Sequence, residues 1–159
     1  MANKQLLILV AALTALMLRA TYARTIQINP AGTVYHLLEQ NNLPQGLLPL
    51  GVQSYVLGAG GALEVTLSGD CNAFVTFTGR KFEFVYASKV NGVIKSGSIS
   101  SVSGVSVQVA FAWHVLHQVT RAGKQLNIQL GNNTRSFPVS AFTQIPNCNR
   151  GIESSTAFA

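Results

Sequence analysis

Residues 105–120 read VSVQVAFAWHVLHQVT, and apolar side chains recur there at every second position. The odd-numbered row consists of Val105, Val107, Val109, Phe111, Trp113, Val115, His117 and Val119. Alternation over this length predicts a β-strand rather than a helix. A straight strand of this length would span about 50 Å, whereas strands usually have about 5–6 residues. We therefore expect a strongly bent strand or two strands, in a twisted or closed sheet, with Trp113 buried beside Phe111 and Val115.

The flanking segments show the same two-residue period, separated by turns rich in glycine, serine and asparagine. They predict strands over residues 52–57, 63–67, 73–77, 81–87, 90–95, 125–130 and 134–137. Residues 34–41 (VYHLLEQN) instead place three apolar side chains on one helical face, with Thr33 as the N-cap. The predicted fold class is mainly β: a curved or barrel-like antiparallel sheet with one N-terminal helix.

The composition fits one domain with a substantial core. Of the 159 residues, 48% are hydrophobic and 10% are charged, against about 25% charged residues in an ordinary soluble domain. These values exclude wholesale disorder. Only two cysteines are present and nothing repeats at a fixed period, which excludes disulfide-dense, coiled-coil and collagen-like classes.

The first 23 residues have the pattern of a secretory signal. Lys4 precedes thirteen uncharged residues, 6–18, and the small residues of Thr21-Tyr22-Ala23 suit cleavage after Ala23. The alternative is a membrane anchor, which needs about 20 apolar residues, and Arg19 interrupts this run. We expect a signal peptide over 1–23, a lead-in over 24–32, one domain over 33–148 and a flexible tail over 149–159. The expected location is outside the cell or in an endomembrane compartment, and no later segment has the length and hydrophobicity of a membrane span.

The remaining chain carries a modest positive charge. Without residues 1–23, nine basic and five acidic residues remain, a net charge of +4. The basic residues are scattered, with Arg80-Lys81 as the one adjacent pair, so the clustered patch of a nucleic-acid-binding protein is missing. The charge either serves solubility or attracts an anionic polysaccharide or lipid headgroup. No partner chain is indicated, and a monomer is the default expectation.

Cys71 and Cys148 are 77 positions apart. In an oxidising compartment we expect them to form a disulfide, and two buried free thiols are the alternative. The spacing does not suit a metal site, because the sequence contains neither C-x-x-C nor H-x-x-x-H.

No catalytic or cofactor-binding motif is complete. The sequence lacks G-x-S-x-G, and Gly104-Val105-Ser106-Val107-Gln108 comes nearest to it. His114 and His117 differ by an odd number and would point to opposite faces of a strand, so they would not share a metal ion. His117 interrupts the apolar odd-numbered row. It is either a satisfied histidine near the end of the strand or a polar contact at the mouth of an apolar cavity.

Residues 105–120 carry no charge on either face. A strand with one face in water alternates core with solvent-facing positions, and the solvent-facing row should carry several charged residues. We therefore expect both faces to be covered, one by the core and one by a helix, the tail or a ligand. This favours a non-catalytic binding module for an apolar or amphiphilic ligand such as a lipid or pigment, with Phe111, Trp113 and His117 as cavity-lining candidates. A fully packed sandwich without a cavity is the alternative.

Asn132-Asn133-Thr134 is the one N-x-S/T sequon in the chain. Gly131 and the paired asparagines predict a tight, exposed turn between two strands. We expect an N-glycan on Asn132, and the alternative is that the asparagines serve turn geometry alone.

Residues 43–57, LPQGLLPLGVQSYVL, resemble the opening signature of a plant family. The resemblance continues through Glu64-Val65, Asp70-Cys71, Gly92-Val93-Ile94, Gly97-Ser98-Ile99, Ser103-Gly104-Val105, Phe111-Ala112-Trp113, Ser136-Phe137-Pro138 and Pro146-Asn147-Cys148. These elements, in this order and spacing, resemble the DUF538 family over about residues 34–148.

The resemblance implies an N-terminal helix and a curved, largely antiparallel β domain, which has been compared with lipid-binding domains of the bactericidal/permeability-increasing type. It also brings two proposed activities, hydrolysis of chlorophyll and of pectin esters, and links to stress and to leaf-hair growth. The alternatives to a binding module are therefore an esterase or a cell-wall-associated stress or development protein. The family implies no agreed catalytic residue, and none is assigned here.

Overall fold

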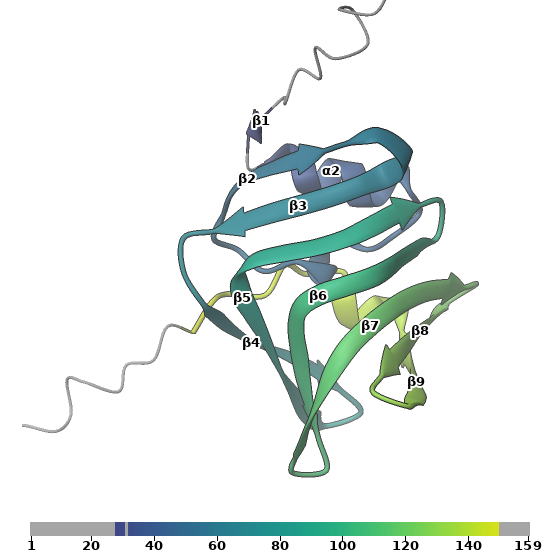
Figure 1. Cartoon of the computed structure of the whole chain (residues 1–159). Coiled ribbons are helices and arrows are strands. Elements are labelled where there is room, and N and C mark those ends of the chain that lie inside the picture. Colours follow the sequence, from purple (N-terminus) through teal and green to yellow (C-terminus); the bar gives the residue numbers. More distant parts are fainter. Residues whose placement is uncertain (1–27, 31, 150–159) are drawn as a thin grey trace, which may run out of the picture.

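The computed structural model describes residues 28–30 and 32–149. A nine-stranded antiparallel sheet, one α-helix and three short 3-10 helices make up this part of the chain (Figure 1). The strands are β1 (Ile28–Pro30), β2 (Val52–Leu57), β3 (Ala62–Leu67), β4 (Cys71–Phe77), β5 (Arg80–Lys95), β6 (Ser98–Val109), β7 (Ala112–Ala122), β8 (Gln125–Leu130) and β9 (Asn133–Pro138). The helices are α2 (Thr33–Gln40), η1 (Gln45–Leu47), η2 (Ala59–Gly61) and η3 (Val139–Phe142). The predicted leader lies outside the described residues, as does the predicted tail beyond Asn149.

The predicted class, a mainly β fold with a curved antiparallel sheet and one helix, is confirmed. The strand order is β1-β2-β3-β5-β6-β7-β8-β9, and β4 pairs with β5 beside this path. Strand β5 is long enough to have two neighbours on one side, because residues 80–86 pair with β4 and residues 89–93 pair with β3. The path ends at β1 and β9 without a pairing between them, so the sheet is curved but not closed into a barrel.

Helix α2 covers the interior through its apolar face. Val34 and Leu38 are fully buried, as their spacing of four predicts. The N-cap is Gly32, one residue before the predicted Thr33. The following connector, residues 47–51 (LLPLG), buries Leu47 and Leu48 against the sheet.

The segment 105–120 is two strands, which was one of the two predicted arrangements. Strands β6 and β7 form a hairpin whose last pair is Val109 with Ala112, so Ala110 and Phe111 alone make the turn. Both turn residues have positive φ, 50° and 67°, as in the two-residue turns that match the twist of paired strands. The hairpin projects from the rest of the molecule at the bottom of Figure 1.

The predicted burial of Trp113 is wrong. A two-residue turn pairs odd with even positions, as in Val107 with His114 and Gln108 with Trp113, and paired side chains share a face of the sheet. The inward row therefore changes from odd positions in β6 to even positions in the first part of β7, where Leu116 is buried. It returns to odd positions at the buried Val119, after the register shift between Leu116 and Gln118. Trp113 is 50% exposed, Val115 48% and Phe111 99%.

Replacing Trp113 with alanine should consequently leave the fold nearly intact. We expect the Trp113→Ala variant to lose about 1 kcal/mol or less of unfolding free energy, far from the 3–5 kcal/mol of a buried aromatic. Urea unfolding followed by far-UV circular dichroism measures this difference. A loss above about 3 kcal/mol would mean that the side chain is buried after all.

Two long strands replace what the sequence predicts as shorter pieces. β5 runs without interruption from residue 80 to 95 and so joins the strands predicted over 81–87 and 90–95, and β6 includes residues 98–104, for which no strand is predicted. Ser101 and Gly104 have positive φ, and the β5–β6 register shifts near Asn91. A side chain at position 104 would collide with the Lys89 carbonyl oxygen. Bulges here let both strands bend and stay paired.

The core fills the concave side of the sheet. Four phenylalanine rings link its strands to η3. Between ring centroids, Phe137 lies 5.2 Å from Phe82 and 6.0 Å from Phe142. The Phe84 centroid lies 5.9 Å from that of Phe142. These ring pairs meet edge to face, which is the favourable geometry for aromatic pairs. These contacts join the end strand β9 and η3 to β5 across the concave side of the sheet, where no backbone pairing joins β9 to β5.

Candidate functional site

A metal site requires a group of ligating side chains, and a histidine-activated nucleophile requires a histidine within hydrogen-bond reach. No group of three or more His, Cys, Asp or Glu residues in this part of the chain could hold a metal ion. His36 lies on the exposed side of α2, near Gln40 (3.2 Å) and Glu39 (3.8 Å). Within the same residues, no hydrogen bond joins a histidine to a serine, threonine or cysteine.

An apolar cavity of about 50 Å³ lies between the connector and the sheet. Asn91 is the one polar side chain in a lining that otherwise consists of Leu47, Leu48, Leu63, Val65, Phe84, Tyr86, Val90, Gly92, Ile99, Val102, Val105, Leu116 and Val119. An engineered cavity that holds benzene has about 150 Å³, so this one has room for little more than the end of an aliphatic chain.

The cavity-lining candidates from the sequence, Phe111, Trp113 and His117, are not among the residues that line this cavity. They belong to β7 or its turn, on the outside of the molecule. His117 is exposed at the point where the β7–β8 register shifts, between Leu116 and Gln118. The turn at Ala110–Phe111 changes which positions face inward, so Phe111 and Trp113 lie on the outside of the sheet.

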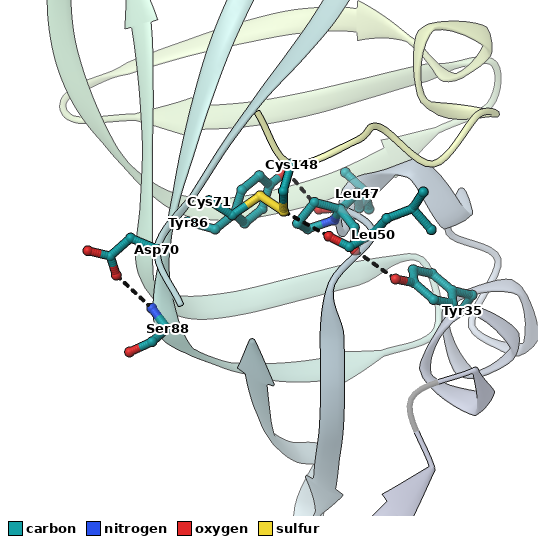
Figure 2. The surroundings of a disulfide bond; sticks show 9 residues. Tyr35, Leu47, Leu50, Asp70, Cys71, Tyr86, Ser88 and Cys148 are labelled. Carbon is teal, nitrogen blue, oxygen red and sulfur yellow. Dashed lines mark hydrogen bonds between the residues drawn. A yellow bond between two sulfur atoms is a disulfide. The ribbon is translucent and has the colours of Figure 1, made fainter. Parts of the chain in front are cut away.

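The connector over the cavity is held in place by polar contacts to the disulfide region (Figure 2). Cys71 and Cys148 are bonded, as predicted, with their Cα atoms 5.1 Å apart. The Cys148 sulfur lies 2.8 Å from the Leu50 carbonyl oxygen, and the Leu50 amide donates to the Pro146 carbonyl oxygen at 2.8 Å. The Tyr35 hydroxyl donates to the Pro49 carbonyl oxygen at 2.6 Å.

Tyr86 ties the same connector to the centre of the sheet. Its ring is buried, and its hydroxyl donates to the Leu47 carbonyl oxygen at 3.1 Å (Figure 2). Burial raises the pKa of Tyr86 well above its usual value of 10.0, because the phenolate would lose its hydration. The hydroxyl therefore remains a donor throughout the physiological pH range. Two tyrosine hydroxyls and the disulfide region thus hold the connector over the cavity.

The distal end of the sheet carries a different feature, an exposed apolar surface. Here β6 and β7 turn at Ala110–Phe111, and β4 and β5 turn at Thr78–Gly79. We call the exposed apolar side chains near these turns the distal patch; they are Phe74, Phe111, Trp113 and Val115. Phe74 is 41% exposed and lies on the outer face opposite Glu83, and Trp113 lies on the outer face opposite Gln108.

Phe111 stands out within the distal patch because its position is unfavourable for folding. The side chain is almost fully exposed and so contributes little to the core. Its φ of 67° lies in the left-handed region, which costs a residue with a Cβ atom about 1–2 kcal/mol and which asparagine or glycine would occupy more readily. Strained, exposed residues of this kind concentrate at functional sites.

Basic side chains adjoin the distal patch. Arg80, Lys81 and Arg135 line a groove of about 300 Å³ together with Phe111 and Gln108, and the Lys81 ammonium lies 5.8 Å from the centre of the Phe74 ring. A second groove of about 410 Å³ lies on the other side of Arg135 and is lined by His114 and Asn133. Aromatic and cationic groups therefore share one end of the molecule.

The distal end carries three bases, Arg80, Lys81 and Arg135, and one acid, Glu83, which lies opposite Phe74. The two ion pairs among the described residues join His36 to Glu39 and Lys89 to Glu64, and they involve none of the three distal bases. Asp70 accepts a hydrogen bond from the Ser88 amide at 3.1 Å. Glu83, the acid nearest to the patch along β5, accepts one from the Asn72 side chain at 2.9 Å.

The sequon residue Asn132 is exposed in the turn between β8 and β9. Its neighbours Asn133 and Thr134 line the second groove beside Arg135. The exposed turn agrees with the geometry expected from the sequence.

The chain belongs to the DUF538 family, because the model of that family, described as a protein of unknown function, matches residues 34–143. No curated protein and no solved structure matches the chain. The family assignment covers both the cavity and the distal patch, and its description names no activity. No described helix is long and apolar enough to cross a membrane.

Proposed function

We propose that this protein is a non-catalytic binding module for an amphiphilic ligand of the lipid type, and that the distal patch is its binding surface. The observation that carries the proposal is Phe111, an almost fully exposed aromatic side chain at a backbone position that disfavours it. Burying such a ring in an apolar environment is worth about 1.5–3 kcal/mol. Trp113 and Phe74 extend the apolar surface, and the basic groups beside them suit the polar part of the ligand.

The disulfide supports a role in an oxidising compartment, in which such bonds persist. We propose export with removal of residues 1–23, which would bring the distal patch into contact with extracellular or endomembrane lipids. Pigments share the amphiphilic chemistry and are tested alongside lipids. An esterase acting on chlorophyll or pectin receives less support, because no histidine among the described residues is hydrogen-bonded to a hydroxyl or thiol nucleophile.

Binding should depend on Phe111 while folding does not. We expect Phe111→Gly to weaken binding to dodecylphosphocholine micelles at least tenfold, since the apolar contact is lost. The same substitution should raise the unfolding free energy by about 1 kcal/mol, because glycine adopts positive φ without strain. Trp113 lies in the patch, so the blue shift of its fluorescence on titration reports binding directly.

Leu57→Ser is the matched control. Leu57 is 41% exposed but lies at the end of β2, next to the end of β5 that is remote from the distal turns. This variant should bind micelles like the parent protein. Equal binding by the parent and Phe111→Gly proteins, or no binding by either, would refute the proposed function. Release of fatty acid, phytol or methanol from an ester substrate by the purified protein would favour the hydrolase instead.

A further inference from the structure

The positive charge of this protein is unevenly placed. Seven basic residues lie in the described part of the chain: Arg80, Lys81, Lys89, Lys95, Arg121, Lys124 and Arg135. Three of them line the groove beside Phe111. Of the other four, Lys89 pairs with Glu64, and Arg121 donates to the carbonyl oxygens of Asn42 and Gly123. Of the five remaining bases, three lie at the distal end. The other two, Lys95 and Lys124, lie at the β5–β6 and β7–β8 turns.

The distal bases are arranged around the projecting hairpin. Arg80 and Lys81 begin β5, Arg135 lies in β9, and the groove they line also includes Ala110 and Phe111 at the hairpin turn. All three bases are exposed. An apolar side chain at the tip with long cationic side chains behind it matches the layering of a membrane surface, in which acyl chains lie beneath a charged headgroup layer.

We infer that the β6–β7 hairpin docks on bilayers that contain anionic lipids, with Phe111 inserted below the headgroups and Arg80, Lys81 and Arg135 bound to headgroup phosphates or carboxylates. This inference rests on the proposed function and names its partner. It also sets an orientation, because β6 and β7 run away from the turn: the bilayer lies at the hairpin end, and the β5–β6 turn points away from it (Figure 1).

A bilayer fits these side chains better than an acidic polysaccharide does. A polysaccharide is held by hydrogen bonds and by rings that stack along a groove or platform, whereas Phe111 is almost fully exposed in a two-residue turn. The most exposed group is purely apolar, and it gains free energy only where it leaves water. The bases then add selectivity for anionic over zwitterionic lipid.

The test compares vesicles of phosphatidylcholine alone with vesicles that also contain phosphatidylserine. A base near an anionic surface raises partitioning about fivefold, so removing three should lower it about 100-fold. The variant is Arg80→Gln/Lys81→Gln/Arg135→Gln. The control, Lys89→Gln/Lys95→Gln/Lys124→Gln, removes the same charge from positions remote from the distal turns and should change partitioning less than about fivefold, because salt screens distant charges.

Sedimentation of the full chain with sucrose-loaded vesicles measures partitioning, and added salt should reduce binding to the anionic vesicles alone. Equal losses in the two triple variants, or equal binding of the parent protein to both vesicle types, would overturn the inference. In that case, continued Phe111-dependent binding to dodecylphosphocholine micelles would leave the proposed function standing. Binding to soluble polygalacturonate with no binding to vesicles would assign the distal bases to a polysaccharide and also overturn the inference.

Discussion

Phe137→Ala should destabilise the protein by about 3–5 kcal/mol. The Phe137 side chain is 1% exposed. Its ring contacts Phe77 at 5.8 Å, Phe82 at 5.2 Å and Phe142 at 6.0 Å between centroids. Phe77 and Phe82 belong to β4 and β5, whereas Phe137 belongs to β9 at the far end of the strand order. Truncation removes the packing that joins β9 to β4 and β5, which are not paired with it, and leaves a cavity that the strands cannot easily fill.

Equilibrium unfolding in guanidinium chloride measures this loss. Phe74→Ala is the matched control, because it removes the same ring from a position that is 41% exposed; we expect it to cost about 1 kcal/mol or less. If Phe137→Ala and Phe74→Ala had the same small effect, the packing of Phe137 against β4 and β5 would not be stabilising the fold.

Removal of the disulfide should have an effect of similar size. Cys71–Cys148 closes a loop of 77 positions, for which restriction of the unfolded chain is worth about 4–5 kcal/mol in the chain-entropy model. We expect Cys71→Ala/Cys148→Ala to lower the unfolding free energy by about 4 kcal/mol. Replacing both residues avoids a free thiol that could pair with another molecule.

Thermal unfolding with and without a reductant checks the same point in the unmodified protein. The melting temperature of the parent protein should fall when the protein is reduced. The melting temperature of the double variant should be the same with and without the reductant. Identical melting of the oxidised and reduced parent protein would show that the bond does not stabilise the fold.

Much of the fold follows from local sequence pattern. Two-residue periodicity located the strands, and the 3.6-residue spacing of Val34 and Leu38 located the helix and its buried face. The Cys71–Cys148 pair followed from the compartment that the leader predicts. These features depend on residues close together or on the small number of cysteines, so they can be read without knowledge of the tertiary structure.

The distal patch could not be predicted because it depends on one unmarked turn. Ala110 and Phe111 adopt positive φ, but neither is the glycine or asparagine that usually marks a two-residue turn. Without the turn, Trp113 and Val115 continue the buried row of Val105–Val109; with it, they point outward. The approach of Arg135 in β9 to Arg80 in β5 is a further long-range consequence of sheet curvature, and no local pattern reports it.

The bond between Cys71 and Cys148 also closes residues 71–148 into a covalent ring. Strands β4 to β9 and η3 all lie between the two cysteines. A protease that cuts one exposed turn inside this ring, such as Ala110–Phe111, opens the chain without releasing a fragment, and the two pieces separate only after reduction. Backbone cleavage at the projecting hairpin and survival of the folded unit are therefore compatible in an oxidising compartment.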